Sequence, residues 1–495
     1  MKRKFIFILV TIMVFMLVSC KPDNNKYAVL KTAFTVDSHI ASNFIYQQDS
    51  KLKISGECIE NGKIIATLYN ENEVVVSTAF GIANKEGKYV IEIDTPKGSF
   101  KEYSLVLHDS NNRFFSSFYG IKFGEVTLLL GDEIIDDSLP KELTENSIDA
   151  LKGKLFIYDI TQTNCEWVTD FTVGGVSDFI YSYYNILKKT LKYNDMPIAF
   201  VNIVFDKTNI INWLPQEEVK DNSTILKYLE DTNQYFENSY EIGQMSYIYN
   251  NLLPKVYNYS YSSIIYSAGV NDFIDYSKSE NSEYHFSVYS KLLLMTLKNI
   301  NKEFYLYNNF SIIQAPSKDV ENIGILRNIQ SKVSKYIPNI VFVPTYDLLN
   351  SNNNTLSSQV VERYYHMINS KITVSDVANV IKKYNGDVLS TITLEFTNTN
   401  KIKLDINSLV FMDENGQKIK IAEDKIITDN HLIIIDLSYY QKSFENPSIS
   451  ELKYYEISSI SYGCENIFKL NTILNDSNLP ILPFYISINS LNEVK

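Results

Sequence analysis

The chain has 495 residues and is acidic, with 58 Asp and Glu against 46 Lys and Arg and a formal net charge of −12. An acidic surface of this kind repels nucleic acid and anionic lipid head groups, so nucleic acid is excluded as a partner. The length is more than one hydrophobic core usually serves, and we therefore expect two or three domains.

Residues 1–19 have the pattern of a secretory signal. A basic head, Lys2 to Lys4, precedes an apolar run from Phe5 to Val18 that is too short to span a bilayer comfortably. The run ends in Leu17-Val18-Ser19-Cys20, which resembles the lipobox of bacterial lipoproteins. In such proteins the Cys is acylated and becomes the new N-terminus.

This resemblance implies a lipid on Cys20 and a polar tether over residues 20–30. We predict an exported, membrane-anchored lipoprotein that faces the periplasm or the cell exterior. Loss of the leader removes three basic residues, so the mature chain has 43 Lys and Arg against 58 Asp and Glu, a net charge of −15. Whether the inner or the outer membrane holds the lipid stays open.

Three further cysteines are far apart in the sequence, without Cys-Xaa-Xaa-Cys spacing: Cys58, Cys165 and Cys464. They predict no metal site and at most one disulfide, whose pairing stays open. We expect no cofactor.

Short alternating runs separated by Gly-containing turns fill residues 31–125. Lys63 to Leu68 and Tyr89 to Ile93 are examples. This pattern of short alternating runs and turns predicts an N-terminal antiparallel β-domain.

Residues 126–371 alternate apolar runs with helical periodicity. From Ser177 to Leu191 one helical face collects Phe179, Tyr183, Ile186, Leu187 and Leu191. Strands are predicted at Leu155 to Ile160, Ile198 to Val204, Ser263 to Ser267, Tyr305 to Ile313 and Ile340 to Pro344. The alternation favours a parallel sheet covered on both sides. Residues 372–495 return to strand character, as in Val388 to Phe396 and His431 to Leu437, and predict a C-terminal β-region.

Segments of the central stretch resemble the sialate O-acetylesterase family in order and spacing. Phe123 to Gly131 resembles the Phe-Gly-Glu-Val-Trp-Leu that leads into the family's Ser-Gly-Gln-Ser-Asn-Met. Met196 to Asn202 resembles its Val-Pro-Val-Gly-Leu-Ile-Asn strand. Asp206-Lys207-Thr208 and Trp213 then stand where the family has a Gly-Gly-Thr turn and a Trp.

The resemblance continues on both sides of these segments. Tyr249 to Pro254, Ile264 to Gly269 and Ile325 to Gln330 are similar to the family's Tyr-Asn-Xaa-Met-Ile-Xaa-Pro, Ile-Trp-Tyr-Gln-Gly-Glu and Leu-Arg-Xaa-Xaa-Gln blocks. Lys53 to Gly56 and Asn478 to Phe484 resemble its first β-domain and its closing segment. The resemblance therefore covers nearly all of the mature chain.

Membership would imply an α/β fold with β flanks. The centre would be a flavodoxin-like SGNH-hydrolase domain of three α/β/α layers, between N-terminal and C-terminal antiparallel β-domains. The family's chemistry would use a Ser nucleophile, a His oriented by an acid, and donors that hold the oxyanion.

The positions that carry this chemistry are substituted. Counted from Gly131, the nucleophile position holds Glu133, a carboxylate that cannot form the ester intermediate. Asp206 and Lys207 replace the Gly-Gly of the oxyanion turn, and the acid opposes the negative charge that develops there. The position of the family His falls near Asn353, in a polar run typical of a loop.

No other residue of the central stretch is a good candidate for these catalytic roles. Ala268 and Val270 stand where the family has Gln and Glu. The α/β stretch holds two histidines, His285 and His366, and a lone His on a helix, as at His366, is more often a surface or packed residue. Ser138 could act only if its loop were rebuilt. The acidic cluster Asp132, Glu133, Asp136 and Asp137 lacks the spacing of a calcium loop and favours a solvated turn.

We therefore predict a non-catalytic surface protein that binds a carbohydrate, such as a sialylated or acetylated glycan, or a protein partner. Open α/β sheets bind ligands at the carboxyl ends of their strands. The candidates around that crevice are Thr208, Trp213, Tyr266 and Trp167, and each could equally be a packing residue. Two alternatives remain: an active carbohydrate O-acetylesterase with rearranged catalytic residues, and a surface scaffold or adhesin without a ligand in the crevice.

Overall fold

The structure is a computed structural model. It describes residues 34–131, 144–160, 166–172, 175–190, 195–205, 208–220, 222–231, 246–276, 282–304, 309–316, 323–348, 356–386, 388–437, 457–464 and 473–488. Several residues singled out in the sequence lie outside these ranges, namely Cys20, Asp132, Glu133, Asp136, Asp137, Ser138, Cys165, Asp206, Lys207 and Asn353.

The chain divides into two compact units. The N-terminal unit comprises Met1–Phe44, Asp49–Pro96 and Lys101–Lys122. The second unit comprises Ile45–Gln48, Lys97–Phe100 and Phe123–Lys495. Each unit is described by itself below.

The N-terminal unit is built from antiparallel strands. They are β2 (Lys51–Glu57), β3 (Lys63–Tyr69), β4 (Val75–Ile82), β5 (Lys88–Asp94), β6 (Ser99–Asp109) and the first part of β7 (Phe115–Gly131). β2 pairs with β5, β3 lies between β4 and β6, and β6 pairs with β7. In β5 buried and exposed residues alternate strictly, because successive side chains of a strand point to opposite faces. Each strand thus gives one face to the core, which includes Leu52, Ile54, Ile91, Ile93, Leu105 and Leu107.

The second unit contains a parallel sheet around the last part of β7. Its other strands are β8 (Leu155–Asp159), β10 (Ile198–Val204), β11 (Ser263–Ser267), β12 (Phe310–Ile313) and β13 (Ile340–Val343). The strand order is β13-β12-β11-β7-β10-β8, and β9 (Trp167–Val168) adds an antiparallel edge to β8. β1 (Ile45–Gln47) also pairs with β7. All five residues of β11 are buried, as expected for a parallel strand covered on both faces.

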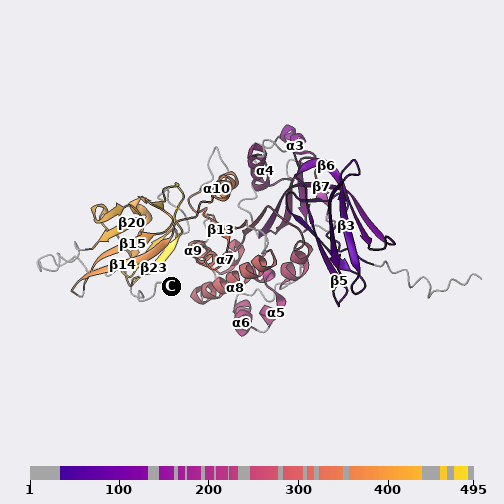
Figure 1. The fold of residues 1–495 in the computed structure, drawn as a ribbon. Coiled ribbons are helices and arrows are strands. Elements are labelled where there is room, and N and C mark those ends of the chain that lie inside the picture. Colours follow the sequence, from indigo (N-terminus) through magenta and orange to yellow (C-terminus); the bar gives the residue numbers. More distant parts are fainter. Residues whose placement is uncertain are drawn as a thin grey trace, which may run out of the picture. The chain divides into compact units, whose positions relative to one another are not determined.

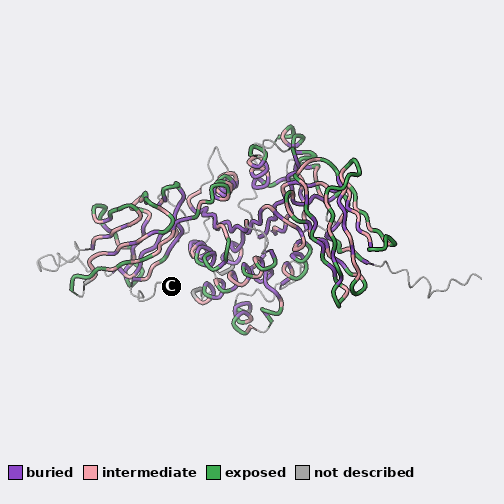
Figure 2. The backbone as a smooth tube through the Cα atoms, in the orientation of Figure 1, coloured by how far each residue is buried: buried purple, intermediate pink, exposed green. Residues whose placement is uncertain are grey.

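Helices lie on both sides of these parallel strands. Figure 1 shows α4 (Asp178–Thr190) and α10 (Leu356–Ser370) on one side, and α7 (Val270–Tyr276), α8 (Ser282–Glu303) and α9 (Ile323–Ser334) on the other. On α4, Phe179, Tyr183 and Leu187 recur every four residues and are buried. The Tyr183 ring meets Tyr364 of α10 with centroids 5.5 Å apart. Figure 2 shows the strands of this sheet buried and the outer turns of the helices exposed.

Shorter helical segments complete the α/β part. They are α3 (Glu145–Leu151), η1 (Ile210–Trp213), α5 (Gln216–Lys220), α6 (Ser223–Asp231), η3 (Ile248–Leu252) and η4 (Leu253–Lys255). Thr144 caps α3, since its side chain accepts a hydrogen bond from the Ser147 amide.

The C-terminal residues form antiparallel strands around a core of their own. One sheet has the order β14 (Val377–Asn385), β15 (Val388–Phe396), β20 (Leu432–Asp436) and β19 (Ile426–Asp429). Another has the order β18 (Lys418–Ile419), β17 (Val410–Met412), β21 (Ser459–Tyr462) and β23 (Phe484–Ser487). β16 (Lys403–Leu404) pairs with β22 (Ile473–Leu474), and η5 (Ile406–Ser408) and η6 (Glu423–Lys425) are single turns. Buried residues such as Ile392, Leu394, Ile433, Ile435 and Ile460 fill the space between the sheets.

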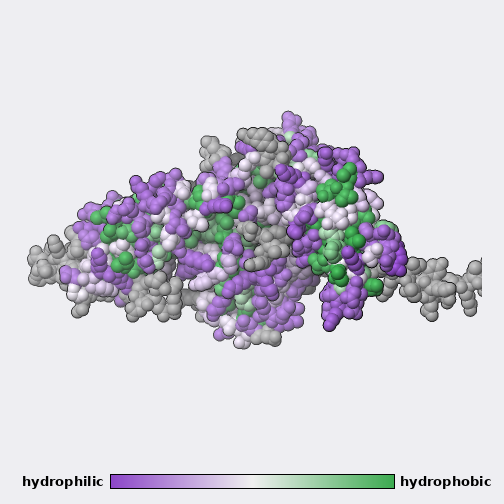
Figure 3. Space-filling view, viewed as in Figure 1, coloured by the Kyte–Doolittle hydropathy of each residue, from purple (hydrophilic) through white to green (hydrophobic). Residues whose placement is uncertain are grey.

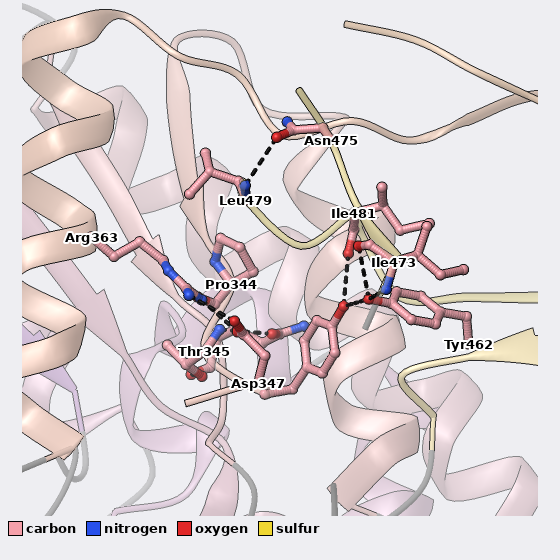
Figure 4. A network of polar contacts seen from close by, with 11 residues as sticks. Pro344, Thr345, Asp347, Arg363, Tyr462, Ile473, Asn475, Leu479 and Ile481 are labelled. Atoms are coloured by element: carbon pink, nitrogen blue, oxygen red, sulfur yellow. Dashed lines mark hydrogen bonds and ion pairs between the residues drawn. The ribbon is translucent and has the colours of Figure 1, made fainter. Parts of the chain in front are cut away.

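A polar network joins these C-terminal strands to the end of β13 (Figure 4). The Tyr346 hydroxyl donates to the Tyr462 hydroxyl and contacts the carbonyl of Ile481 at 3.2 Å. The Tyr462 oxygen accepts from the amide of Ile473 at 3.0 Å. Burial raises the pKa of both phenols, so they stay protonated and act as hydrogen-bonding groups at neutral pH.

Cys58 is a free cysteine. The Cys464 thiol donates to the carbonyls of Tyr462 and Phe484 at 3.5 and 3.4 Å. Among the described residues no cluster of His, Cys, Asp and Glu could hold a metal ion. A search of the same residues finds no helix with the length and apolar character needed to cross a bilayer.

Candidate functional site

The order of the parallel strands defines a switch point. From β7 the chain places β10 and β8 on one side and β11, β12 and β13 on the other. In open α/β sheets the ligand crevice lies beyond the carboxyl ends of the strands at such a reversal. The candidate site is therefore located where β7 and β11 end, at Gly131 and Ser267.

Gly131 and Ser267 are in very close contact at this point. They are register partners in the parallel β7–β11 pair. Gly131 has a φ of +143°, and a Cβ atom built on it would lie 1.7 Å from the carbonyl oxygen of Ser267. The Gly131 carbonyl accepts from the amide of Phe205, which follows β10. The absence of a side chain at Gly131 thus lets three strand ends converge.

Three of the four predicted crevice residues come together. The Trp213 indole donates to the Thr208 hydroxyl at 3.4 Å and stands edge-to-face on the Tyr266 ring, with centroids 5.7 Å apart. Thr208 is 1% exposed, Trp213 0% and Tyr266 1%. In this conformation the three side chains pack on one another in the interior and present no ring face to a ligand.

Trp167 lies away from this cluster, on β9 at the edge of the sheet. Its ring packs on Tyr158 and Phe156 of β8, with centroids 5.3 and 6.4 Å away. It is half-buried, so part of its surface faces solvent.

Asp272 ties two site segments together, and sequence reasoning did not single it out. It is 1% exposed near the start of α7. Both carboxylate oxygens lie 3.1 Å from the amide nitrogen of Ile210, which donates to them. This bond holds the segment after β10 against the helix after β11. A buried carboxylate is stable only with such donors.

Two buried glutamine side chains link the remaining strand ends. Gln330 of α9 accepts from the Ala315 amide at 2.8 Å and donates to the Ala268 carbonyl at 3.0 Å. Gln314 accepts from the amide of Thr345 at 3.0 Å. The carboxyl ends of β11, β12 and β13 are therefore joined through side-chain amides. The rim of the candidate site is held by packing and hydrogen bonds within the protein.

Replacing Gln330 by Leu is expected to destabilise the protein by about 2–4 kcal/mol, because a buried N–H and a buried C=O both lose their partner. Urea unfolding followed by circular dichroism measures the loss. The matched control is Gln417→Leu at an exposed position, which should change stability by less than about 0.5 kcal/mol. Equal midpoints for the two variants would show that the Gln330 bridge contributes nothing.

The two histidines of the α/β stretch have other environments. His285 of α8 is buried beside the Tyr228 ring, and its Nε2 is 3.9 Å from an Asp231 carboxylate oxygen. Burial lowers the pKa of His285, and the nearby Asp231 carboxylate opposes that effect. His366 is exposed on α10, and its Nδ1 lies 3.5 Å from the Ser370 hydroxyl.

Solved structures include a protein of similar fold. A carbohydrate acetylesterase from Xanthomonas citri superposes with a TM-score of 0.63 over 92% of this chain and 100% of that one, at 13% sequence identity. A β-glucuronidase from Bifidobacterium dentium gives a TM-score of only 0.25 at 8% identity, over 69% of this chain and 57% of that one, and carries no argument.

No protein-family model matches the sequence, and no curated protein matches it. The likeness at 13% identity therefore establishes the fold and nothing finer. The chain has a mixed α/β fold like that of a carbohydrate esterase.

Proposed function

We propose that the protein is an exported lipoprotein that uses an SGNH-type esterase fold to bind carbohydrate without hydrolysing it. The fold assignment is supported by the parallel order β13-β12-β11-β7-β10-β8, in which the strands on the two sides of β7 meet at a crossover from β10 to β11. The export and the lipid on Cys20 are supported by the basic head, apolar run and lipobox-like end of residues 1–20.

The observation that carries the proposal is the combination of an esterase-like fold with substituted catalytic positions. The fold is that of a carbohydrate acetylesterase, whereas Glu133 stands where the resembling family has its Ser. Acyl transfer needs a nucleophile, a base and an oxyanion hole together. Glu133, Asn353 and the Asp206-Lys207 pair supply none of the three in the form this chemistry uses.

The described rim supports a binding role. Gln330, Gln314 and Asp272 hold the strand ends in place by hydrogen bonds from buried positions, which would keep a crevice at those ends pre-formed. Rigid, pre-formed crevices are typical of small-ligand sites. Thr208, Trp213 and Tyr266 would support the ligand from below, and the half-exposed Trp167 is the candidate for direct ring stacking on a sugar.

The test is to incubate the purified protein with an aryl acetate, with O-acetylated sialic acid and with a Ser-directed fluorophosphonate. We expect no turnover and no labelling. Calorimetric titration with the same acetylated sugar and with a panel of glycans should give saturable binding. Turnover or labelling would establish the alternative, an active O-acetylesterase with rearranged residues.

A second experiment tests whether Trp167, on β9 at the edge of the sheet, contributes to glycan binding, and whether the protein binds a glycan at all. Trp167→Ala should weaken the binding of any glycan found in the panel, whereas Tyr485→Ala, an exposed aromatic change on β23, should leave it unchanged. Absence of binding across the panel, with the protein folded, would favour the scaffold or adhesin function.

A further inference from the structure

Several large apolar side chains of the N-terminal unit are exposed, and four of them lie near the end of β4 at Ile82. Ile59 is 69% exposed, Phe80 59%, Ile82 58% and Phe115 61%. We call these four residues the apolar end. On the face in view, Figure 3 shows hydrophobic surface over this unit.

Strand register shows that the apolar end is one surface. On β4, Phe80 is paired with Ile65 of β3, and Ile65 is paired with His108 of β6. The His108 ring lies 6.0 Å from the ring of Phe115. Side chains directly opposite in antiparallel strands share a face. A row of side chains therefore runs across β4, β3, β6 and β7.

The turn that carries Ile59 lies at the same end. Its residue Asn61 donates to the carbonyl of Ala83 at 3.1 Å, and the Ala83 amide donates to Gly62 at 2.9 Å. Ala83 directly follows Ile82, the last residue of β4. Ile59 and Ile82 thus lie on neighbouring segments.

The chain also enters the unit at this end. Phe34, the first described residue, forms a bridge with Cys58, and Thr35 donates to the carbonyl of Glu57 at 2.8 Å. Cys58 precedes the exposed Ile59. Thirteen residues separate Phe34 from Cys20. A fully extended segment of that length spans at most about 50 Å. A lipid on Cys20 would therefore keep Phe34, and with it this end of the unit, within about 50 Å of the bilayer.

The local charge differs from that of the whole chain. Lys63 Nζ lies 4.1 Å above the Phe80 ring, and Arg113 beside Phe115 has a side chain 64% exposed. Lys85 and Lys88 follow β4 in sequence.

Four acids belong to the same segments, namely Glu57, Glu60, Glu86 and Asp109. The Asp109 carboxylate is already engaged, because it accepts from the amides of Arg113 and Phe114 at 2.6 and 3.1 Å. The charges at this end nearly cancel, although the chain carries −12. Repulsion from an anionic lipid surface is thus smaller at this end than the net charge of the chain alone would suggest.

We propose that the apolar end seats the N-terminal unit in the head-group region of the bilayer that carries its lipid anchor. The inference rests on the lipidation of Cys20 within the proposed function. Apolar side chains flanked by Lys and Arg suit this region. The apolar side chains enter the boundary of the acyl layer, while the charged groups of Lys and Arg stay in water. Ile59 and Ile82 favour a lipid partner over a sugar, because aliphatic side chains offer no ring face for stacking.

The experiment uses the full chain, expressed with its own leader, extracted in detergent and reconstituted into zwitterionic phosphatidylcholine vesicles. Phe80→Trp reports on the apolar end. Val75→Trp, which is 55% exposed on the same strand about 17 Å away, is the matched control. Trp fluorescence is compared between plain vesicles and vesicles with a spin label near the head group, with the unsubstituted chain as baseline. Flotation in a sucrose gradient measures anchoring separately.

We expect every variant to float with the vesicles and only the Phe80→Trp fluorescence to be quenched. If the Phe80→Trp variant floats but its fluorescence is not quenched, the proposal that the apolar end contacts the head groups is wrong, while the proposal that Cys20 carries a lipid still holds. Equal quenching of both variants would overturn the proposed seating as well, since contact would not be confined to this end. Failure to float would refute the anchor and this inference with it. If soluble oligosaccharide, but not spin-labelled lipid, changed the Phe80→Trp emission, the partner would be a glycan instead.

Discussion

Gly131→Ala is expected to abolish stable folding or to cost about 4 kcal/mol or more, a value reached by few single substitutions. The added Cβ would lie 1.7 Å from the Ser267 carbonyl oxygen, and both contacting groups are held by the backbone of paired parallel strands. To relieve this steric clash, β7 and β11 would have to separate at the switch point. Urea unfolding and the yield of soluble protein measure the effect.

The matched control is Gly153→Ala. Gly153 also has a positive φ, +68°, but no atom lies within 4 Å of a Cβ built there. It should therefore cost only the backbone strain of a left-handed Ala, about 1–2 kcal/mol. If the Gly131→Ala variant were as stable as the Gly153→Ala variant, the strand ends at the switch point would be able to move apart at little cost in folding free energy.

Much of the strand inventory could be predicted from the sequence, because buried parallel strands are continuous apolar runs. The predicted strands at Ile198 to Val204 and Ser263 to Ser267 coincide with β10 and β11, and Val388 to Phe396 coincides with β15. Of the predicted run from Tyr305 to Ile313, the structure describes β12 at Phe310–Ile313, and residues 305–308 lie outside the described ranges.

Strand order and burial at the site could not be predicted in this way. β8 comes directly after β7 among the parallel strands, yet it pairs with β10 and not with β7. An isolated aromatic such as Trp213 gives the same signal whether it lines a crevice or fills a core, and only the fold shows that it is buried.

The side chains that hold the site were missed for a related reason. Gln330 bonds to Ala268, which is 62 residues away, and Asp272 bonds to Ile210 at the same separation. Such pairings leave no periodic signal, because each polar residue is conspicuous only after the fold brings its partner close. Gln330 belonged to a recognised sequence block, which could have marked it as a candidate support for the strand ends.

Arg363 is another residue whose role no sequence pattern indicated. In the structure its guanidinium makes two parallel hydrogen bonds to the Asp347 carboxylate, at 2.5 and 2.7 Å, and a third to the Pro344 carbonyl at 2.7 Å (Figure 4). Only 11% and 12% of the two charged side chains are exposed. Arg363 therefore clamps the end of β13 to α10, next to the Tyr346–Tyr462 contact.

Arg363→Met is expected to cost about 3–5 kcal/mol, because it leaves a largely buried carboxylate without its partner. The matched control, Lys152→Met, breaks an ion pair with Asp170 of similar length, 3.0 Å, between side chains that are 58% and 75% exposed. It should cost no more than about 1 kcal/mol. Thermal and urea unfolding of both variants give the comparison.

The double variant Asp347→Leu with Arg363→Met tests the mechanism. Removal of both charges eliminates the unpaired carboxylate, so the double variant should be more stable than Arg363→Met alone, by about 1–3 kcal/mol. A cost that merely adds Asp347→Leu to Arg363→Met would mean that the two side chains act independently. The end of β13 would then be held by the packing of Tyr346 against Tyr462 rather than by the ion pair.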